Sequence, residues 1–458
     1  MASVALLVTL GLGALLALGA FALASWREGQ PRAARVALLL AGAGALLFFL
    51  AALLSPAGRW IVLGLVAAAA GAAAILSLLP IGHAEPARPP SCRYDERDIM
   101  FARARLEPGS AAYKSYYALR PENKAGDDRM RTLPGLLSPH GREAQPVVFA
   151  ATGATFDHIE HLRGRVDGPV AAECLPLEPA AATDYLKGLA RYWGARAVGV
   201  TELRPYHVYS YVGRGAGTYG APIDLDHRYA LAFTVEMAHD MVCTAPAAPT
   251  LLESARQYGA AAAIAILLAH ALRAMGYPAR AHVDGNYRVV APLVAWDAGL
   301  GEFGRLGLLM TPDLGPRVRL GVVTTDLPLL PDGRRPAPSV LDFCQICEKC
   351  AENCPVRAIP FGPRQEIDGA FRWRIAQEIC YRYWCVAGTD CARCVAVCPY
   401  AHPDTAWHNL VRRAARRSGL ARRAILRLDH LFYGARPQPG PAPAWLPPNP
   451  DRSKHRYA

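Results

Sequence analysis

Two runs of cysteine in the last third of the chain restrict its fold more than any other feature. Three closely spaced thiolates and one distant thiolate hold a [4Fe–4S] cube, and in two-cluster segments the fourth cysteine of each run ligates the other cube. Two successive runs that both end in Cys-Pro disfavour a zinc ribbon or a disulfide framework. The spacing therefore predicts two [4Fe–4S] clusters and a role in electron transfer. The runs are Cys344-x2-Cys347-x2-Cys350-x3-Cys354-Pro355 and Cys391-x2-Cys394-x3-Cys398-Pro399.

The crossed ligation of two-cluster segments assigns all but one of the ligands. The first cluster is predicted to take Cys344, Cys347, Cys350 and Cys398, and the second to take Cys354, Cys391 and Cys394. The remaining ligand is Cys380 or Cys385, and spacing alone leaves both open. The other cysteines are scattered and suggest no disulfide framework, so we expect a reducing compartment. They are Cys92, Cys174 and Cys243.

Three long apolar runs occupy the N-terminus, at residues 2–25, 36–54 and 61–81. About 20 apolar residues are needed to cross a bilayer, so residues 1–82 are predicted to form a three-helix transmembrane anchor. The first run lacks a basic start and is followed by two more, unlike a cleaved signal peptide. The loop after the first run holds Arg27, Arg32 and Arg35, whereas the next loop holds only Arg59. The positive-inside rule then predicts an inner-membrane protein whose catalytic part faces the cytoplasm.

The apolar runs contain no ionisable side chain, so a pure anchor is the favoured interpretation. A quinone site at the cytoplasmic boundary, near His83, is the alternative. The net charge of +12 also suits a membrane surface, since no nucleic-acid-binding motif accompanies it. The arginine-rich stretch at 412–427 would suit anionic lipid headgroups, or it is a solvated helix face.

The rest of the chain predicts an α/β core. Residues 83–145 are expected to form a linker and an irregular surface arm. Within 146–341 the pattern predicts helices at 180–193 and 253–275 and strands at 195–203, 229–237, 287–294 and 318–325, with a glycine-rich turn at 213–219. Pro292 would confine its strand to an edge. A ferredoxin-like segment is predicted at 342–403 and a basic helix with a tail at 404–458, packing on the core.

Across most of residues 93–435 the chain resembles the corrinoid-dependent reductive dehalogenases. The resemblance implies an α+β fold, with a nitroreductase-like α/β core that binds a base-off corrinoid beside a ferredoxin-like segment with two [4Fe–4S] clusters. It also implies that Cys380, and not Cys385, completes the second cluster. The motifs that carry the resemblance are Tyr94-Asp-Glu-Arg-Asp-Ile-Met-Phe-Ala-Arg103, Tyr229-Ala-Leu-Ala-Phe-Thr-Val-Glu-Met237, Ala298-Gly-Leu-Gly-Glu-Phe-Gly-Arg305, Phe343-Cys-Gln-Ile-Cys347 and Gly388-Thr-Asp-Cys391.

The resemblance further implies a reaction centre at Tyr258, Arg319 and Asn286. A phenol with a reference pKa of about 10 can donate a proton when a nearby cation stabilises the phenolate, and arginine keeps its charge throughout. Other roles are open for each residue. Tyr258 could be a core residue, Arg317 could be the true neighbour of the tyrosine, and Asn286 could be a turn residue.

The expected function is the reductive removal of halide from an organohalide, with a membrane lipid as a further partner. The electron donor is expected to be a low-potential ferredoxin or flavoprotein, or a quinol, and no nucleic acid partner is expected. One alternative is a related corrinoid reductase of another substrate, similar to the epoxyqueuosine reductases. The other is a membrane-bound iron–sulfur electron carrier that acts on no substrate.

Overall fold

A computed structural model describes residues 1–78, 85 and 87–447, so the quinone site predicted near His83 lies outside the described residues. The chain divides into two compact units. The first unit comprises Met1–Glu85, Pro338–Lys349 and His402–Pro441. The second comprises Pro86–Ala337, Cys350–Ala401 and Ala442–Ala458.

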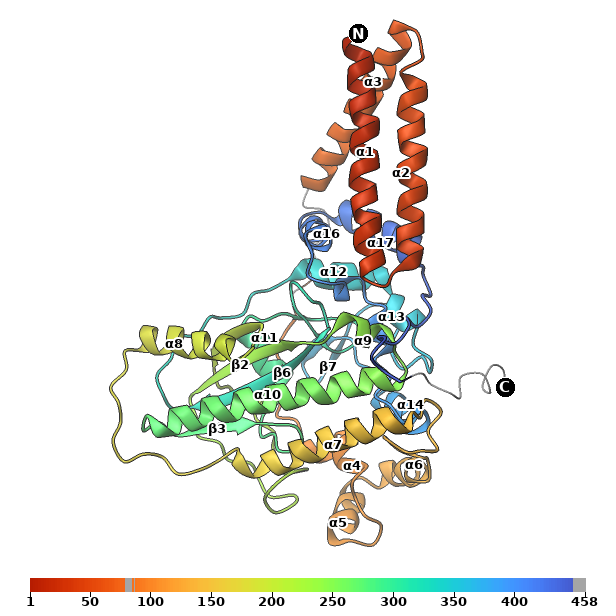
Figure 1. Cartoon of the computed structure of the whole chain (residues 1–458). Helices are drawn as coiled ribbons and strands as arrows, with labels where there is room; N and C mark the ends of the chain where they lie inside the picture. The colour runs from red at the N-terminus through yellow and green to blue at the C-terminus, as the bar shows by residue number, and fades with distance from the viewer. Residues whose placement is uncertain (79–84, 86, 448–458) are drawn as a thin grey trace. The chain divides into compact units, whose positions relative to one another are not determined.

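The first unit is built on three long apolar helices, α1 (Ala2–Arg27), α2 (Pro31–Ala51) and α3 (Pro56–Leu78), which match the three predicted runs. Helices α1 and α2 run side by side as a hairpin (Figure 1). Small residues allow the close approach: a Cβ at Gly11 would lie 3.0 Å from the ring of Phe49, and α2 buries a row of alanines. The other faces expose leucines, as expected of helices long and apolar enough to cross a membrane.

Three further helices complete the first unit. They are α12 (Pro338–Cys347), α16 (Ala406–Arg417) and α17 (Gly419–Tyr433). Ser418 caps α17, because its hydroxyl accepts a hydrogen bond from the Ala421 N–H at 3.4 Å. Helix α17 packs against α2, α3 and α12, so the C-terminal basic segment lies at the foot of the apolar helices (Figure 1).

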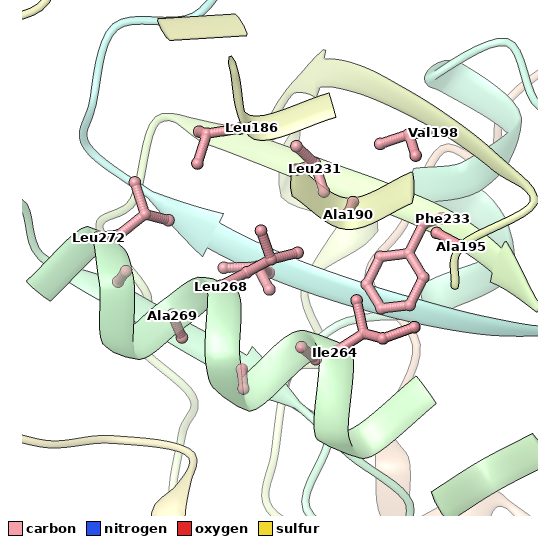
Figure 2. Packing of buried hydrophobic residues seen from close by; sticks show 14 of the residues in the cluster. Leu186, Ala190, Ala195, Val198, Leu231, Phe233, Ile264, Leu268, Ala269 and Leu272 are labelled. Atoms are coloured by element: carbon pink, nitrogen blue, oxygen red, sulfur yellow. The ribbon is translucent and has the colours of Figure 1, made fainter. Parts of the chain in front are cut away.

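The second unit is centred on a four-stranded sheet with the order β1-β2-β6-β3, in which all neighbouring strands are antiparallel. The strands are β1 (Ala197–Glu202), β2 (Tyr229–Glu236), β3 (Ala279–His282) and β6 (Val318–Thr325). Side chains alternate between the two faces of β2. Leu231 and Phe233 pack on one face with α8 (Pro179–Tyr192) and α10 (Ala248–Ala274), as Figure 2 shows. Ala230 and Ala232 pack on the other face with α11 (Ala291–Asp297).

Helix α10 is also long and apolar enough to be a candidate membrane span. It instead contributes Ile264, Leu268 and Leu272 to the buried cluster on the sheet (Figure 2). The sequence prediction of a buried core helix there is confirmed. The predicted helix 180–193 and the predicted strands 195–203, 229–237 and 318–325 are also present.

Two sequence predictions are wrong. Residues 287–294 are not a strand, because helix α11 begins at Ala291 and Pro292 occupies its first turn, where no intrahelical N–H is needed. The arm at 91–145 is not irregular either. It forms α4 (Met100–Arg103), α5 (Ala111–Leu119) and α6 (Pro121–Arg131), in which Tyr117 donates to Asp127 at 2.9 Å. Buried tyrosine–aspartate pairs hold these helices, so their polar composition concealed a packed structure.

Shorter elements complete the second unit. They are α7 (Pro146–Leu162), α9 (His239–Cys243), α13 (Lys349–Glu352), α14 (Gln377–Ala387), α15 (Arg393–Ala396) and the two-stranded ribbons β4 (Glu302–Phe303) with β5 (Leu309–Met310) and β7 (Gln365–Ile367) with β8 (Ala370–Arg372). Helix α13 begins at the last residue of the first unit. Helix α7 lies along α10 (Figure 1).

Candidate active site and cluster-binding cysteines

Tyr258 lies on α10, one turn after Ser254, so both side chains share one helix face. The tyrosine is half-buried. The guanidinium carbon of Arg319, on β6, lies 5.1 Å from the centroid of its ring. This distance is within the range of a cation–π contact. The structure therefore brings together two of the three residues predicted for the reaction centre.

Two acceptors hold Arg319 in place. Its Nη2 donates to Ser254 Oγ at 2.7 Å and to Asp390 Oδ2 at 3.2 Å. Ser254 Oγ itself donates to Asp390 Oδ2 at 2.5 Å. Asp390 directly precedes Cys391, so this network joins the tyrosine to a predicted cluster ligand.

Arg317, the alternative neighbour of the tyrosine, lies elsewhere. It is buried, and it donates to Glu236 Oε1 at 2.9 Å, to the Ala401 carbonyl at 2.8 Å and to the Met237 carbonyl. These bonds tie the start of β6 to the end of β2 and to the segment that follows the second cysteine run.

Burial is the main reason that the phenol of Tyr258 stays protonated at neutral pH. Burial raises the pKa of Tyr258, the positive charge of Arg319 opposes this, and Asp284 and Asp390 add to the increase. Burial also raises the pKa of Asp390, against the charge of Arg319 and the hydrogen bond from Ser254. A protonated phenol beside a fixed cation can release its proton and be stabilised as a phenolate.

Two buried atoms of this network have no hydrogen-bond partner among the described residues. They are Arg319 Nε and Asp390 Oδ1. Buried polar atoms without partners are uncommon and are typical of sites that hold a ligand, an ion or water. A donor and an acceptor beside Tyr258 suit a site for a polar group of a substrate or cofactor.

Asn286 is fully buried, and its amide is used by other partners. Nδ2 donates to the Arg163 carbonyl at 3.0 Å, and Oδ1 accepts from Arg280 Nη2 at 2.9 Å. These bonds hold the turn after β3, so its role at a reaction centre stays a prediction. The next residue, Tyr287, is an electrostatic neighbour of Tyr258.

The glycine-rich segment 213–219 packs against this turn. A Cβ at Gly215, where φ is +79°, would lie 2.6 Å from the Gly285 carbonyl oxygen, which only glycine permits. Glu96 Oε2 accepts from the Gly213 and Arg214 N–H groups at 2.9 and 3.1 Å. Arg214 in turn reaches Glu96 at 3.3 Å and Asp284 at 3.9 Å.

Several residues of the site were missed by sequence reasoning. Only Asp390 and Ser254 carried a local signal, the first directly before Cys391 and the second four residues before Tyr258. Arg214, Asp284 and Tyr287 carried none, because loops far apart in the sequence bring them together.

The cysteines predicted to hold the second cluster are mutual electrostatic neighbours. Burial raises the pKa of Cys380 to about 11, and Cys354 adds to the increase. Burial raises the pKa of Cys394, and the charges of Cys350, Cys380 and Cys354 raise it further. Burial also raises the pKa of Cys391, and the charges of Cys394 and Cys380 add to this increase. Buried thiols that repel one another as thiolates fit a cationic iron centre, which would neutralise them.

Cys385 lies in different surroundings. It packs in an apolar cluster with Met100 and Met130, and Tyr381 is its ionisable neighbour. This placement favours Cys380 over Cys385 as the cluster ligand.

Cys344 and Cys347 of the first cysteine run lie on α12, in the first unit. Burial raises the pKa of Cys347 to about 12, with Cys344 and Asp429 adding to the increase and Lys349 opposing it. Cys350 and Cys398 belong to the second unit, so the full ligand set rests on the spacing. Among the described residues no three Cys, His, Asp or Glu side chains could hold a metal ion. A cube is larger than one ion and spreads its ligands more widely.

A cavity of about 270 Å³ lies between α4, α6 and α14. Arg103 lies in its wall and is paired with Asp127 and Glu378, both at 2.8 Å. None of Tyr258, Arg319 and Asn286 lines this cavity. It is separate from the candidate reaction centre.

Parts of this chain are similar to known proteins. The model of a 4Fe-4S dicluster domain matches residues 343–402. The tetrachloroethene reductive dehalogenase of Sulfurospirillum multivorans is 33% identical over 262 residues, which is 49% of this chain and 51% of that protein. A second tetrachloroethene reductive dehalogenase, from Desulfitobacterium hafniense, is 34% identical over 213 residues, which is 44% of this chain and 38% of that protein.

A solved structure shares the fold. It is the catabolic reductive dehalogenase NpRdhA in complex with 3-bromo-4-hydroxybenzoic acid, with 25% identity and a TM-score of 0.62 over 77% of this chain and 48% of that chain. Another structure of a reductive dehalogenase, described as suggesting a mechanism for B12-dependent dehalogenation, has the same TM-score. This chain spans about half the length of these relatives. Over these matched parts the chain is similar in sequence and fold to reductive dehalogenases, and it contains a 4Fe-4S dicluster segment.

Proposed function

We propose that this protein is a membrane-anchored reductive dehalogenase that uses a corrinoid and two [4Fe–4S] clusters. Two electrons and one proton convert an organohalide into the hydrogenated product and a halide ion. The observation that carries the proposal is the Tyr258–Arg319 pair, held by Asp390 directly before the cluster ligand Cys391. An acid therefore lies next to a predicted source of electrons.

The residues of the chain have separate tasks in this scheme. A corrinoid bound in the α/β core would supply the reducing centre, and the two clusters would supply its electrons. Tyr258 donates the proton from its phenol oxygen. Arg319 stabilises the phenolate that remains, and Ser254 and Asp390 keep the guanidinium in position. Asn286 orders the loop that carries Tyr287.

The cluster ligands follow the cysteine spacing. We infer that Cys344, Cys347, Cys350 and Cys398 hold one cluster and that Cys354, Cys380, Cys391 and Cys394 hold the other. The mutual electrostatic effects show that Cys354, Cys380, Cys391 and Cys394 lie near one another, with Cys350 also near Cys394; the division into two sets rests on the spacing. We also propose that the domains of the chain end after residues 82, 145, 341 and 403.

We also infer that α1, α2 and α3 cross the inner membrane with α16 and α17 on the cytoplasmic side. Arg32, in the first turn of α2, donates to the Leu431 carbonyl of α17 at 3.4 Å, so this end of the hairpin and the C-terminal helices share one side. Helices α16 and α17 expose both apolar and arginine side chains there, which suits anionic lipid headgroups. The exposed residues are Trp407, Leu410, Val411, Leu428 and Leu431 with Arg413, Arg416, Arg417, Arg423 and Arg427.

The test is halide release by the purified protein. The protein is loaded anaerobically with corrinoid and iron–sulfur, reduced with a low-potential viologen, and given chlorinated ethenes and bromophenols in turn. Release of halide that depends on the corrinoid supports the proposal. No release from any of these compounds, with iron and cobalt both at full occupancy, would contradict the assigned reaction. Protein that binds iron but no corrinoid would indicate an electron carrier.

A further inference from the structure

A chain of buried acid and base side chains crosses the first unit. Glu28, at the end of α1, lies 2.9 Å from His408 Nε2. The ring of His408 stacks on that of His402, with centroids 4.7 Å apart. His402 Nε2 lies 3.3 Å from Asp429 Oδ1, and Asp429 pairs with Lys349. Lys349, Asp429 and His408 are nine-tenths or more buried, and Glu28 and His402 are only slightly more exposed.

One end of this buried chain lies where an apolar helix ends. Phe21 of α1 contacts Trp407 of α16 and Phe432 of α17, with ring centroids 6.1 and 5.3 Å apart. Glu28 follows two turns later on α1. The proposed membrane boundary and the first acid–base pair therefore coincide.

The other end reaches the first cysteine run. Lys349, the partner of Asp429, lies two residues after Cys347 and directly before Cys350. Helix α12, which carries Cys344 and Cys347, packs against α16 and α17. The buried chain thus extends from the membrane boundary to a predicted cluster ligand.

Two hydroxyl groups beside this chain lack a well-formed hydrogen bond among the described residues. They are Ser25 Oγ, on α1, and Tyr433 Oη, on α17. Ser25 is fully buried, and its hydroxyl is close enough to Tyr433 to act on the phenol. The ring of Tyr433 lies 4.1 Å from that of His402, between centroids. Two hydroxyls that contact each other next to an imidazole, without a well-formed partner among the described residues, suit a ligand that carries oxygen atoms.

Buried acid and base side chains are not needed merely to hold α1, α16 and α17 together. A buried ion pair gains little over apolar packing, because desolvation offsets the attraction. Burial lowers the pKa of His402 to about 4, and the nearby charges of His408 and Lys349 contribute. His402 is therefore uncharged at neutral pH.

We propose that this site exchanges electrons with a lipid-soluble quinone. The hydroquinone would bond to Ser25 and Tyr433, and its protons would pass to the His408–Glu28 pair and to His402. Hydroquinone oxidation gives the quinone, two protons and two electrons, and the electrons pass singly to the cluster held by Cys344 and Cys347. This assigns the electron donor of the proposed dehalogenase, so it rests on that function.

The reverse reaction provides the test. Holoprotein in lipid nanodiscs is reduced, freed of excess reductant and mixed with 2-methyl-1,4-naphthoquinone, while iron–sulfur absorbance is followed. Two reduced clusters, one quinone and two protons give two oxidised clusters and one hydroquinone. We expect His408→Gln and Glu28→Gln to slow this reoxidation about tenfold, the effect of roughly one lost hydrogen bond. Reoxidation by ferricyanide, a water-soluble oxidant, should not change.

Three controls separate this site from a structural role. Tyr433→Phe keeps the ring and removes only the hydroxyl, so a weaker apparent quinone affinity with normal ferricyanide rates supports the site. His161→Gln changes an exposed histidine of α7 and should behave as the parent protein. An azido-naphthoquinone should label α1, α16 or α17 even without clusters. Unchanged quinone rates in all three site variants, equal slowing by both oxidants, or labelling confined elsewhere would overturn the proposal. Halide release driven by reduced viologen separately tests the dehalogenase function.

Discussion

The guanidinium of Arg319 lies over the Tyr258 ring, with its carbon 5.1 Å from the ring centroid. From this position its positive charge can stabilise a phenolate. Ser254 and Asp390 both accept hydrogen bonds from Nη2 of Arg319. These two bonds keep the charge in place beside the ring.

Replacing Tyr258 with Phe removes the proton donor and keeps the ring. We expect dehalogenation to fall by about 10²- to 10⁴-fold, the usual contribution of a general acid, with iron, cobalt and absorption spectra unchanged. Tyr287→Phe is the matched control, because it removes a neighbouring phenol that we do not assign as the donor. Turnover by Tyr258→Phe at the parental rate would remove this residue from its role.

Replacing Asp390 with Asn removes a negative charge that raises the pKa of Tyr258. With the charge of Arg319 less compensated, the pKa of Tyr258 should fall. The alkaline limb of kcat/KM should then move to lower pH. Ser254→Ala removes one hydrogen bond to Arg319 without changing the charge, so its alkaline limb should stay in place while the rate falls.

These two variants separate charge from positioning. Since Asp390 precedes Cys391, the iron content of each variant is measured first. Two results would contradict the electrostatic role of Asp390. One is an equal shift of the alkaline limb in both variants, and the other is no shift in Asp390→Asn when its iron content is full.

Site residues that lie within a sequence motif could be predicted, whereas residues brought together by loops far apart in the sequence could not. Tyr258 and Arg319 were found because each lies within a motif, and the sheet then brings α10 and β6 together. Asp284 and Arg214 could not be found, because they meet through loops whose paths depend on tertiary packing. The strand predicted at 287–294 failed because four apolar residues around Pro292 fit a short helix as well as an edge strand. The helices of 100–131 were missed because their buried faces are tyrosines and aspartates.

The choice between Cys380 and Cys385 can be tested by substitution with serine. Cys380→Ser should lose most of the iron of one cluster, because the remaining three thiolates hold a cube poorly. Cys385→Ser should keep full iron, since Cys385 packs with Met100 and Met130. For each variant, the iron content per protein and the electron paramagnetic resonance spectrum of the reduced protein are measured. Iron loss in Cys385→Ser alone would reverse the assignment.

Asp297, at the end of α11, holds together segments that lie far apart in the sequence. It accepts hydrogen bonds from Tyr206 at 2.5 Å, from His207 at 3.0 Å and from Arg334 Nη2 at 2.5 Å. Although burial opposes ionisation, these partners lower the pKa of Asp297 to about 2. The unfolded value is about 3.9, so the carboxylate stabilises the fold above about pH 4 and this contribution is lost as the pH falls through 2.

Asp297→Asn should therefore lower the free energy of unfolding at pH 7 by about 2 kcal/mol, the order expected from such a pKa difference. The gap from the parent protein should narrow below pH 4, where Asp297 of the unfolded parent chain begins to take up a proton while the folded carboxylate stays charged down to about pH 2. Denaturant titration in detergent at several pH values measures this, with Asp184→Asn on the exposed face of α8 as the matched control. A gap that stays constant from pH 7 down to pH 3 would mean that packing around residue 297, and not its charge, stabilises this corner of the core.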